Sequence, residues 1–112
     1  MPNPKYVLFT GGNGEIYFRL QAANGETILS SEGYSQKSGA ENGVASVRKN
    51  APLDERYQRK TASNGSPYFV LVAGNGEPIG RSEMYSSEEA RDNGIEAVKK
   101  VAADAPVEDA TD

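Results

Sequence analysis

The chain carries an internal duplication, and this feature constrains its fold more than any other. Residues 13–49 align with residues 64–100 without a gap, and 18 of the 37 aligned pairs are identical. Farther on, APLDE from Ala51 corresponds to APVED from Ala105, although the offset grows from 51 to 54 positions. The sequence therefore predicts one domain over residues 1–112 that consists of two repeats, residues 5–55 and 56–112.

Both repeats share an alternation of apolar and other residues that is typical of half-buried strands. We predict that the recurring apolar set lies on the buried face of a sheet: Phe18, Leu20, Phe69 and Leu71. Asn24-Gly25 and Asn75-Gly76 come next, and they predict hairpins with type I′ turns because Asn and Gly tolerate positive φ angles. A third strand follows each turn, so three strands precede the helix of each repeat.

The apolar period changes to that of a helix in the last part of each repeat. In the second repeat, Ser86 is predicted to start a capping box with Glu89, and the helix extends to Ala103. The first repeat has Ser38 in place of Glu89, so only its helix start lacks this support. Both helices are expected to cover the sheet face that carries the apolar set.

An Asn-Gly pair lies inside each predicted helix, as Asn42-Gly43 and Asn93-Gly94. A glycine in a helix costs about 1 kcal/mol relative to alanine, yet both repeats retain it. We interpret the glycines as points of close approach between helix and sheet. Asn42 and Asn93 have no such explanation, and they are candidates for exposed contact residues.

One repeat of about 50 residues would bury too little apolar surface for a stable fold, since even domains of about 60 residues are marginal. Two repeats that share a core make a small domain of ordinary size. We therefore expect the repeats to pair about a pseudo-twofold axis, and an unduplicated relative to need a second copy.

The repeated combination of an NGE hairpin, an SE-x-YS segment and an NG-[VI]-x-x-V-[RK]-K helix resembles the YegP-like family of small bacterial proteins of unknown function. The resemblance extends over residues 5–108 and includes both copies. It implies an α+β fold in which each repeat has three strands, a helix and a final strand. These would form a single antiparallel sheet with two helices on one face, and the final strands would be exchanged between repeats. The resemblance implies no activity, so it does not identify any catalytic residue.

Composition excludes several kinds of chemistry. The chain has no cysteine and no histidine, which removes disulfides, thiolate chemistry, and the commonest general base and metal ligand. We expect no metal and no cofactor. Residues 1–103 hold all 12 basic residues and 12 of the 16 acidic ones, so the excess acid lies in the tail. A neutral body does not favour nucleic acid or an anionic membrane. No segment approaches the roughly 20 apolar residues of a membrane span, and the expected location is the cytoplasm.

The SE-x-YS segments are the most distinctive repeated motif, because Glu32 and Tyr34 recur as Glu83 and Tyr85. Two interpretations stay open. The carboxylates and tyrosines could form a site where strand meets helix, or each tyrosine could cover an edge of the core while the last serine of the motif caps a helix. We favour the second interpretation.

Three functions follow from these patterns. The leading hypothesis is a non-enzymatic module that binds a partner protein through the sheet face that the helices leave open. The alternative is binding of single-stranded nucleic acid on Tyr17, Arg19 and Tyr68, helped by the basic junction between the repeats: Arg48, Lys49, Arg56, Arg59 and Lys60. The third and weakest hypothesis is an enzyme that uses Glu32 and Glu83.

The candidate binding residues are Tyr17, Arg19, Tyr68, Tyr34, Tyr85, Asn42 and Asn93. We predict no catalytic residue. The expected state is a monomer with pseudo-dimeric repeats, and a weak homodimer is the alternative.

Overall fold

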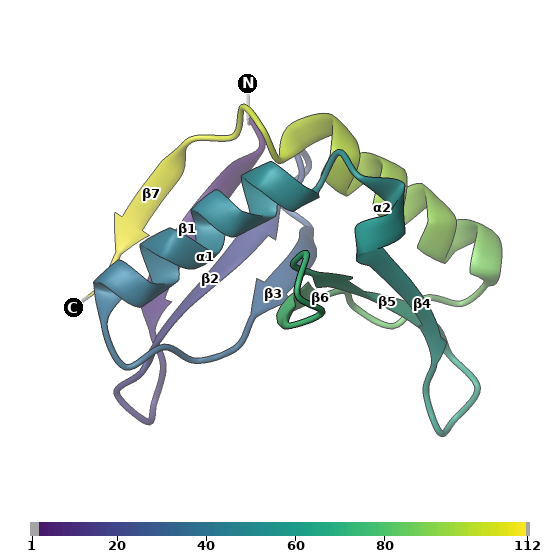
Figure 1. The fold of residues 1–112 in the computed structure, drawn as a ribbon, viewed down its shortest axis with the longest axis horizontal. Coiled ribbons are helices and arrows are strands. Elements are labelled where there is room, and N and C mark those ends of the chain that lie inside the picture. The colour runs from purple at the N-terminus through teal and green to yellow at the C-terminus, as the bar shows by residue number, and fades with distance from the viewer. Residues whose placement is uncertain (1–2, 112) are drawn as a thin grey trace.

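The computed structural model describes residues 3–111. The chain forms two similar halves, each with three strands followed by a helix (Figure 1). The strands of the first half and its helix are β1 (Lys5–Thr10), β2 (Ile16–Gln21), β3 (Thr27–Ser31) and α1 (Lys37–Asn50). The remaining elements are the short 3-10 helix η1 (Asp54–Arg56), β4 (Tyr57–Thr61), β5 (Pro67–Val72), β6 (Pro78–Arg81), α2 (Glu88–Val101) and β7 (Val107–Ala110).

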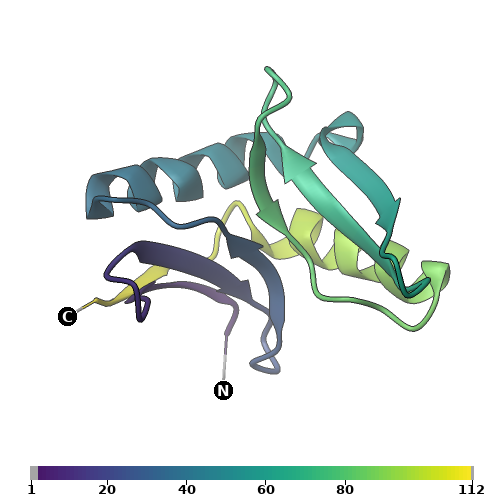
Figure 2. The same ribbon diagram turned by 90° about the horizontal axis from the view of Figure 1, so that it is seen from below.

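All described strands belong to one sheet with the order β4-β5-β6-β3-β2-β1-β7. The third strands of the two repeats, β3 and β6, pair antiparallel in the middle of this sheet. The repeats are thus joined edge to edge, with equivalent strands at equivalent distances from the joint. Both helices lie on the same side of the sheet (Figure 2), and the α+β fold with pseudo-twofold pairing is confirmed.

The final strand differs between the repeats. β7 of the second repeat lies parallel beside β1 of the first, held in part by the ion pairs Lys5–Glu108 and Lys37–Asp109. The sheet is therefore antiparallel except at this edge. In the first repeat the equivalent segment forms η1 and leads directly into β4. It cannot lie parallel to β4, because parallel neighbours need a crossover of about a dozen residues.

The hairpin positions are confirmed, but the predicted type I′ turns are wrong. In the β2–β3 turn, the Gly25 N–H donates to the Ala22 carbonyl, and only Gly25 has a positive φ, of 87°. Asn24 keeps a negative φ, and its Oδ1 accepts the Glu26 N–H at 3.0 Å. This is the three-residue loop in which a type I turn is followed by a left-handed glycine.

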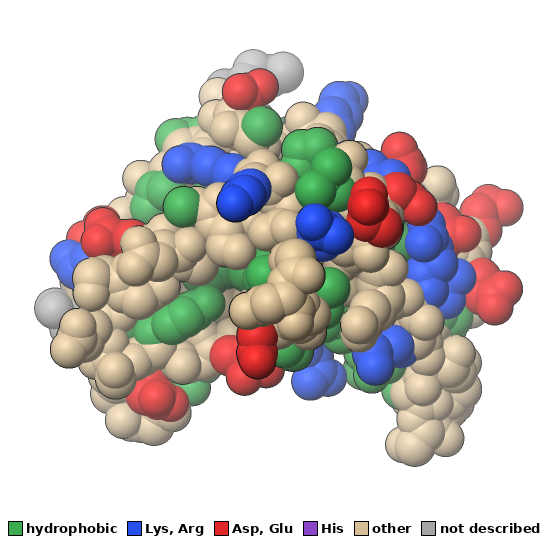
Figure 3. Space-filling model, viewed as in Figure 1, with side chains coloured by type: hydrophobic (Ala, Val, Ile, Leu, Met, Phe, Trp, Pro, Cys, Tyr) green, Lys and Arg blue, Asp and Glu red, His purple; other side chains and the backbone are tan. Residues whose placement is uncertain are grey.

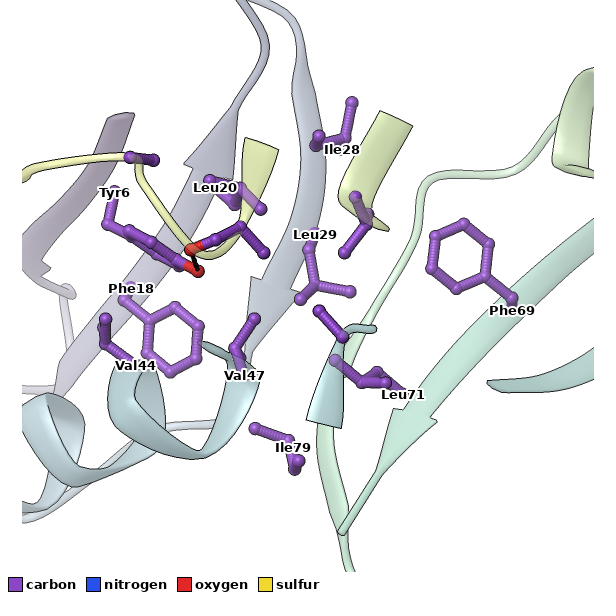
Figure 4. Packing of buried hydrophobic residues seen from close by; sticks show 14 of the residues in the cluster. Tyr6, Phe18, Leu20, Ile28, Leu29, Val44, Val47, Phe69, Leu71 and Ile79 are labelled. Atoms are coloured by element: carbon purple, nitrogen blue, oxygen red, sulfur yellow. Dashed lines mark hydrogen bonds between the residues drawn. The ribbon is translucent and has the colours of Figure 1, made fainter. Parts of the chain in front are cut away.

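The core lies between the sheet and both helices and draws on both repeats (Figure 4). The four side chains of the predicted apolar set are fully buried: Phe18, Leu20, Phe69 and Leu71. A β-bulge in each repeat also turns Ile28 and Ile79 into this core, next to Leu29. Figure 4 shows residues of the two repeats meeting in a single cluster, which is the shared core that the duplication predicts.

Two tyrosines connect each repeat to the helix of the other. Tyr6 in β1 donates its hydroxyl hydrogen to the carbonyl of Ala102, just after α2, at 2.7 Å. Tyr57 in β4 makes the equivalent bond to Ala51, just after α1, also at 2.7 Å. These buried bonds satisfy carbonyls that a helix end leaves without a partner. The last turn of each helix is therefore completed by the opposite repeat.

The helix starts correct one prediction. Ser87, and not Ser86, is the N-cap of α2, where its side chain accepts the Ala90 N–H at 3.0 Å. In the first repeat the N-cap is Gln36, with no side-chain cap bond, so Ser35 does not cap α1 either. The Tyr85 N–H is bonded to the Pro67 carbonyl, so the chain follows the sheet as far as Tyr85 and starts the helix only after a further connecting residue.

The helical glycines are explained by the tyrosines of the SE-x-YS segments. A Cβ on Gly43 would lie 2.5 Å from Tyr34 Oη and 2.8 Å from Phe18 Cε2. A Cβ on Gly94 would collide with Tyr85 Oη in the same way. Close approach is confirmed, and the group that approaches most closely is the phenol.

We expect Gly94→Ala to destabilise the protein by about 1 to 3 kcal/mol, because the added methyl group overpacks a filled site. The neighbouring Asn93→Ala is the matched control, since it replaces an exposed side chain on the same helix. Urea denaturation of both variants checks this. A Gly94→Ala variant with raised stability, as helix propensity alone predicts, would contradict the packing account.

Candidate functional site

The sheet face opposite the helices carries a row of directly paired residues that crosses both repeats. From β1 to β4 the row runs Val7, Arg19, Ser30, Arg81, Val70 and Gln58. Arg19 alternates with the buried Phe18 and Leu20, so its side chain lies on the open face. Only Ser30 separates the two arginines, and the joint between the repeats runs between Ser30 and Arg81.

Each of these arginines lies over an aromatic ring. Arg19 Cζ is 4.7 Å from the centroid of the Phe9 ring, and Phe9 stacks on Tyr17 with centroids 5.7 Å apart. Arg81 Cζ is 5.7 Å from the centroid of the Tyr68 ring. A guanidinium over a ring gains cation–π attraction and keeps its edge free for hydrogen bonds.

The two guanidinium groups lack anionic partners. Among residues 3–111, no carboxylate forms an ion pair with Arg19 or Arg81. The Nε atom of Arg19 is also buried without a hydrogen-bond partner within that range. An unsatisfied buried donor is unfavourable, and because this Nε is buried, a ligand on the face would have to meet the other nitrogens of the guanidinium group.

A small cavity of about 120 Å³ lies beside Arg81 on this face. Its lining includes Tyr68, Ser30 and Glu32. Pockets for drug-sized ligands are usually about 300 to 1,000 Å³, so this one has room for a side chain and not for a cofactor. The arrangement supports binding of a side chain.

The structure places Tyr17, Arg19 and Tyr68 on the open face as predicted, with the first two in one repeat and Tyr68 in the other. Phe9 and Arg81 belong with them and were missed. Phe9 stands in an apolar run in which both alternating sets are hydrophobic, so its face could not be assigned. Arg81 follows the bulge of its hairpin, which shifts the alternation of β6 relative to β5.

The three arginines of the basic junction have partners within the fold. Arg48 donates to the Ala105 carbonyl at 2.6 Å and lies over the Tyr6 ring, so it is a structural side chain. Arg56 donates from Nε to Asn50 Oδ1 at 3.0 Å. Arg59 forms ion pairs with acidic side chains of η1 and α2. These three arginines are engaged within the fold, and Lys49 and Lys60 are exposed, which weakens the support that the junction gave to nucleic-acid binding.

The SE-x-YS corners are structural at their first serine and at their tyrosine. Ser31 Oγ accepts the Phe18 N–H at 2.9 Å and donates to the Glu32 carbonyl at 2.8 Å, and the second repeat has the same pair of bonds at Ser82. Tyr34 stacks on Phe18 with centroids 6.3 Å apart. The corner tyrosines are thus part of the core edge.

Burial raises the pKa of Tyr34 and of Tyr85, and the carboxylates of Glu32 and Glu83 raise them further. Both phenols therefore stay protonated at neutral pH and cannot serve as bases. Glu32 lines the cavity on the open face, whereas Glu83 lines a different groove beside α2. The two glutamates do not form a catalytic pair.

Charge on the rest of the surface is mixed. On the face of the molecule in Figure 3, acidic and basic side chains are interspersed and no large area has a single sign. Within residues 3–111, no set of three or more potential metal-ligating side chains is grouped to hold an ion. Over the same residues, neither helix has the length and apolar character needed to cross a bilayer.

The comparisons with known proteins agree with this fold. The family described as "Domain of unknown function (DUF1508)" matches the chain twice, over residues 12–58 and 62–109. The chain belongs to the DUF1508 family. Each match includes the second and third strands of a repeat and the helix that follows them, namely β2, β3 and α1 in the first and β5, β6 and α2 in the second.

Relatives of this DUF1508 chain span nearly its whole length. A UPF0339 protein of Bordetella pertussis is 54% identical over 106 residues, which cover 95% of this chain and 96% of that protein. The UPF0339 protein YegP of Escherichia coli K12 is 47% identical over the same shares of the two chains. The resemblance noted in the sequence is therefore confirmed.

Two solution NMR structures match the DUF1508 fold. A UPF0339 protein from Shewanella oneidensis gives a TM-score of 0.91 at 46% identity, covering 97% of this chain and 92% of that one. YegP from Escherichia coli, described as a protein of unknown function, gives 0.92 at 45% identity, covering 99% and 96%. These likenesses establish the fold and leave the function to be inferred from the surface.

Proposed function

We propose that this protein is a non-enzymatic cytoplasmic module that binds an acidic segment of a partner protein on its open sheet face. The observation that carries the proposal is the pair Arg19 and Arg81, which lie over aromatic rings and form no ion pair with a carboxylate of residues 3–111. Guanidinium groups bind carboxylates with two parallel hydrogen bonds, which gives both strength and orientation. Because the protein has a net charge of −4, two neighbouring arginines on one face form a local positive charge that differs in sign from the molecule as a whole.

The spacing of the arginines fits an extended segment. Two strand separations lie between them, which places their backbones about 10 Å apart. One extended peptide with two carboxylates can reach both groups, while its other side chains pack on Tyr17, Val70 and the rim of the small cavity. The half-buried rings contribute contact area at little cost in side-chain entropy.

Single-stranded nucleic acid is the second candidate, because bases also stack on aromatic rings that have arginines beside them. Phosphate binding, however, draws most of its affinity from net positive charge. The body of this protein is neutral, and the three arginines of the junction are engaged internally. We therefore expect negligible binding of an oligonucleotide at physiological salt.

The test compares a short glutamate-containing peptide, its glutamine counterpart and a fluorescent oligothymidine. We expect only the glutamate peptide to bind, and Arg81→Gln to weaken it by about tenfold, since a charged hydrogen bond contributes about 1.5 kcal/mol or more. Lys49→Gln is the control, because it removes an exposed positive charge from α1. Isothermal titration calorimetry measures the peptides.

The nucleic-acid alternative makes the opposite prediction. Oligothymidine affinity would fall with salt at a slope of about 0.7 per phosphate contact, and Tyr68→Ala would weaken it by about 1 to 3 kcal/mol. Sub-micromolar binding of the oligonucleotide at physiological salt, lost in Tyr68→Ala, would replace our proposal with this one.

A further inference from the structure

Two of the residues that the repeats share have no structural task. Glu83 and Asn93 are exposed, and within residues 3–111 neither side chain has a hydrogen bond or an ion pair. The same is true of Glu32 and Asn42, their counterparts in the first repeat. The shared Ser31 and Ser82, the corner tyrosines and the helical glycines, by contrast, are explained by packing or hydrogen bonds. Retention of side chains that do nothing for the fold points to a ligand.

Glu83 and Asn93 line one groove, with a volume of about 440 Å³. The groove lies between the β2–β3 turn of the first repeat and the corner and helix α2 of the second. Its buried and half-buried lining includes Ile28, Tyr85 and Ala97. Its exposed lining includes the two shared residues and Glu26 from the turn. Each repeat thus supplies one wall.

The residues that line the groove recur in the other repeat more often than the aligned residues do as a whole. Eight of its twelve residues recur 51 positions away in the other repeat, whereas 18 of 37 recur over the aligned stretch as a whole. Those eight are Ala22, Asn24, Glu26, Ile28, Glu83, Tyr85, Asn93 and Gly94. Each repeat therefore retains most of the residues that form both walls, although in this groove one wall comes from the first repeat and the other wall from the second.

The chemistry of the groove is acidic and apolar. Glu26 and Glu83 supply two carboxylates, and no lysine or arginine lies in the lining. Both carboxylates are close enough to the Tyr85 phenol to raise its pKa, after the larger effect of burial. Met84, 45% exposed, adds an adaptable apolar surface beside them.

We propose that this groove binds a basic segment of a partner protein through a lysine or arginine side chain. The aliphatic stem of that side chain packs on Tyr85 and Met84, and its charged end meets Glu26 and Glu83, as long cationic side chains do at surfaces that are apolar below and charged above. The Asn93 amide supplies a donor and an acceptor for the backbone of the segment. The site is separate from the open face and takes the opposite charge, so it does not depend on the function proposed there.

The experiment uses the full chain and two probe peptides, one of alternating lysine and leucine and one of alternating glutamate and leucine. NMR spectra of the side-chain amides report on Asn93 directly. We expect the lysine peptide to shift the Asn93 signal, and Glu83→Gln to weaken the binding about two- to fivefold, as loss of an exposed ion pair does. Glu89→Gln is the matched control, because it removes an exposed carboxylate of α2 that does not line the groove.

Several results would overturn the proposal. These are no shift of Asn93 at millimolar lysine peptide, an equal response to the glutamate peptide, or an equal loss in Glu83→Gln and Glu89→Gln. An Asn93 signal that moves with protein concentration alone would assign the groove to a second copy of the chain, which also contradicts it. Asn93→Ala provides a further check, since we expect it to weaken the lysine peptide while thermal stability is unchanged.

Discussion

Residues 1–56 produced alone will not persist as a folded monomer; they will either dimerise or unfold. In the intact chain, β3 is paired with β6, and α1 packs against β5 and β6 of the other repeat. The isolated repeat would expose Leu29 and Val47, which are fully buried in the shared core. It would also lose the Tyr57 hydroxyl that binds the carbonyl of Ala51 after α1.

The energetic argument is one of size. A chain of about 50 residues rarely buries enough apolar area to offset its conformational entropy. A second copy can restore the missing contacts, because the joint between β3 and β6 relates equivalent strands and would become a true twofold interface. Sedimentation with thermal melting checks this, and the full chain is the control. A compact monomer that melts cooperatively would refute the shared-core argument.

The hairpins and the buried face could be predicted because they depend on local periodicity. Phe18 and Leu20 alternate with polar residues, so only one sheet face can be buried, and the Asn-Gly pairs mark where the chain turns. The exact turn type could not be predicted in this way. An Asn-Gly pair is compatible with both type I′ and the type I turn with a left-handed glycine, and the loop length that separates them is set by the strand register.

The features that were missed depend on contacts between distant segments. Arg81 is aligned with Arg19 only because β3 and β6 pair across the joint, and the bulge before β6 changes which residues face outwards. The absence of a final strand in the first repeat follows from the direct connection of η1 to β4. Ser86 and Ser87 are equally able to cap a helix, so the position of Tyr85 on the sheet determines which one does so.

The two candidate sites also differ in whether local periodicity or contacts between distant segments determine them. Tyr17, Arg19 and Tyr68 could be placed on the open face from alternation alone. The groove beside α2 could not be predicted, because its walls, Glu26 on one side and Glu83 with Asn93 on the other, are far apart in the sequence and meet only through the exchange of contacts between repeats. Repetition within the chain nevertheless marked all of its polar residues except Thr27.

The largest effect of a single substitution is expected at Phe69. Its side chain is fully buried and makes an edge-on contact with Tyr57, at 5.7 Å between centroids, and a stacked contact with Tyr85 at 6.4 Å. Replacement by alanine leaves a cavity among rings from β4 and from the corner before α2, and the Tyr57 ring cannot move into it without losing its hydrogen bond to the Ala51 carbonyl. We therefore expect Phe69→Ala to cost about 3 to 5 kcal/mol.

A loss of that size is comparable with the whole stability of a small domain, which is about 5 to 15 kcal/mol. The adjacent Tyr68→Ala is the matched control, because it removes a ring of similar size from the open face, where the site is half-exposed and leaves no enclosed cavity. Urea denaturation of both variants gives the comparison. A Phe69→Ala midpoint equal to that of the unaltered protein, or equal losses in the two variants, would show that the core does not lie on the face that carries Phe69.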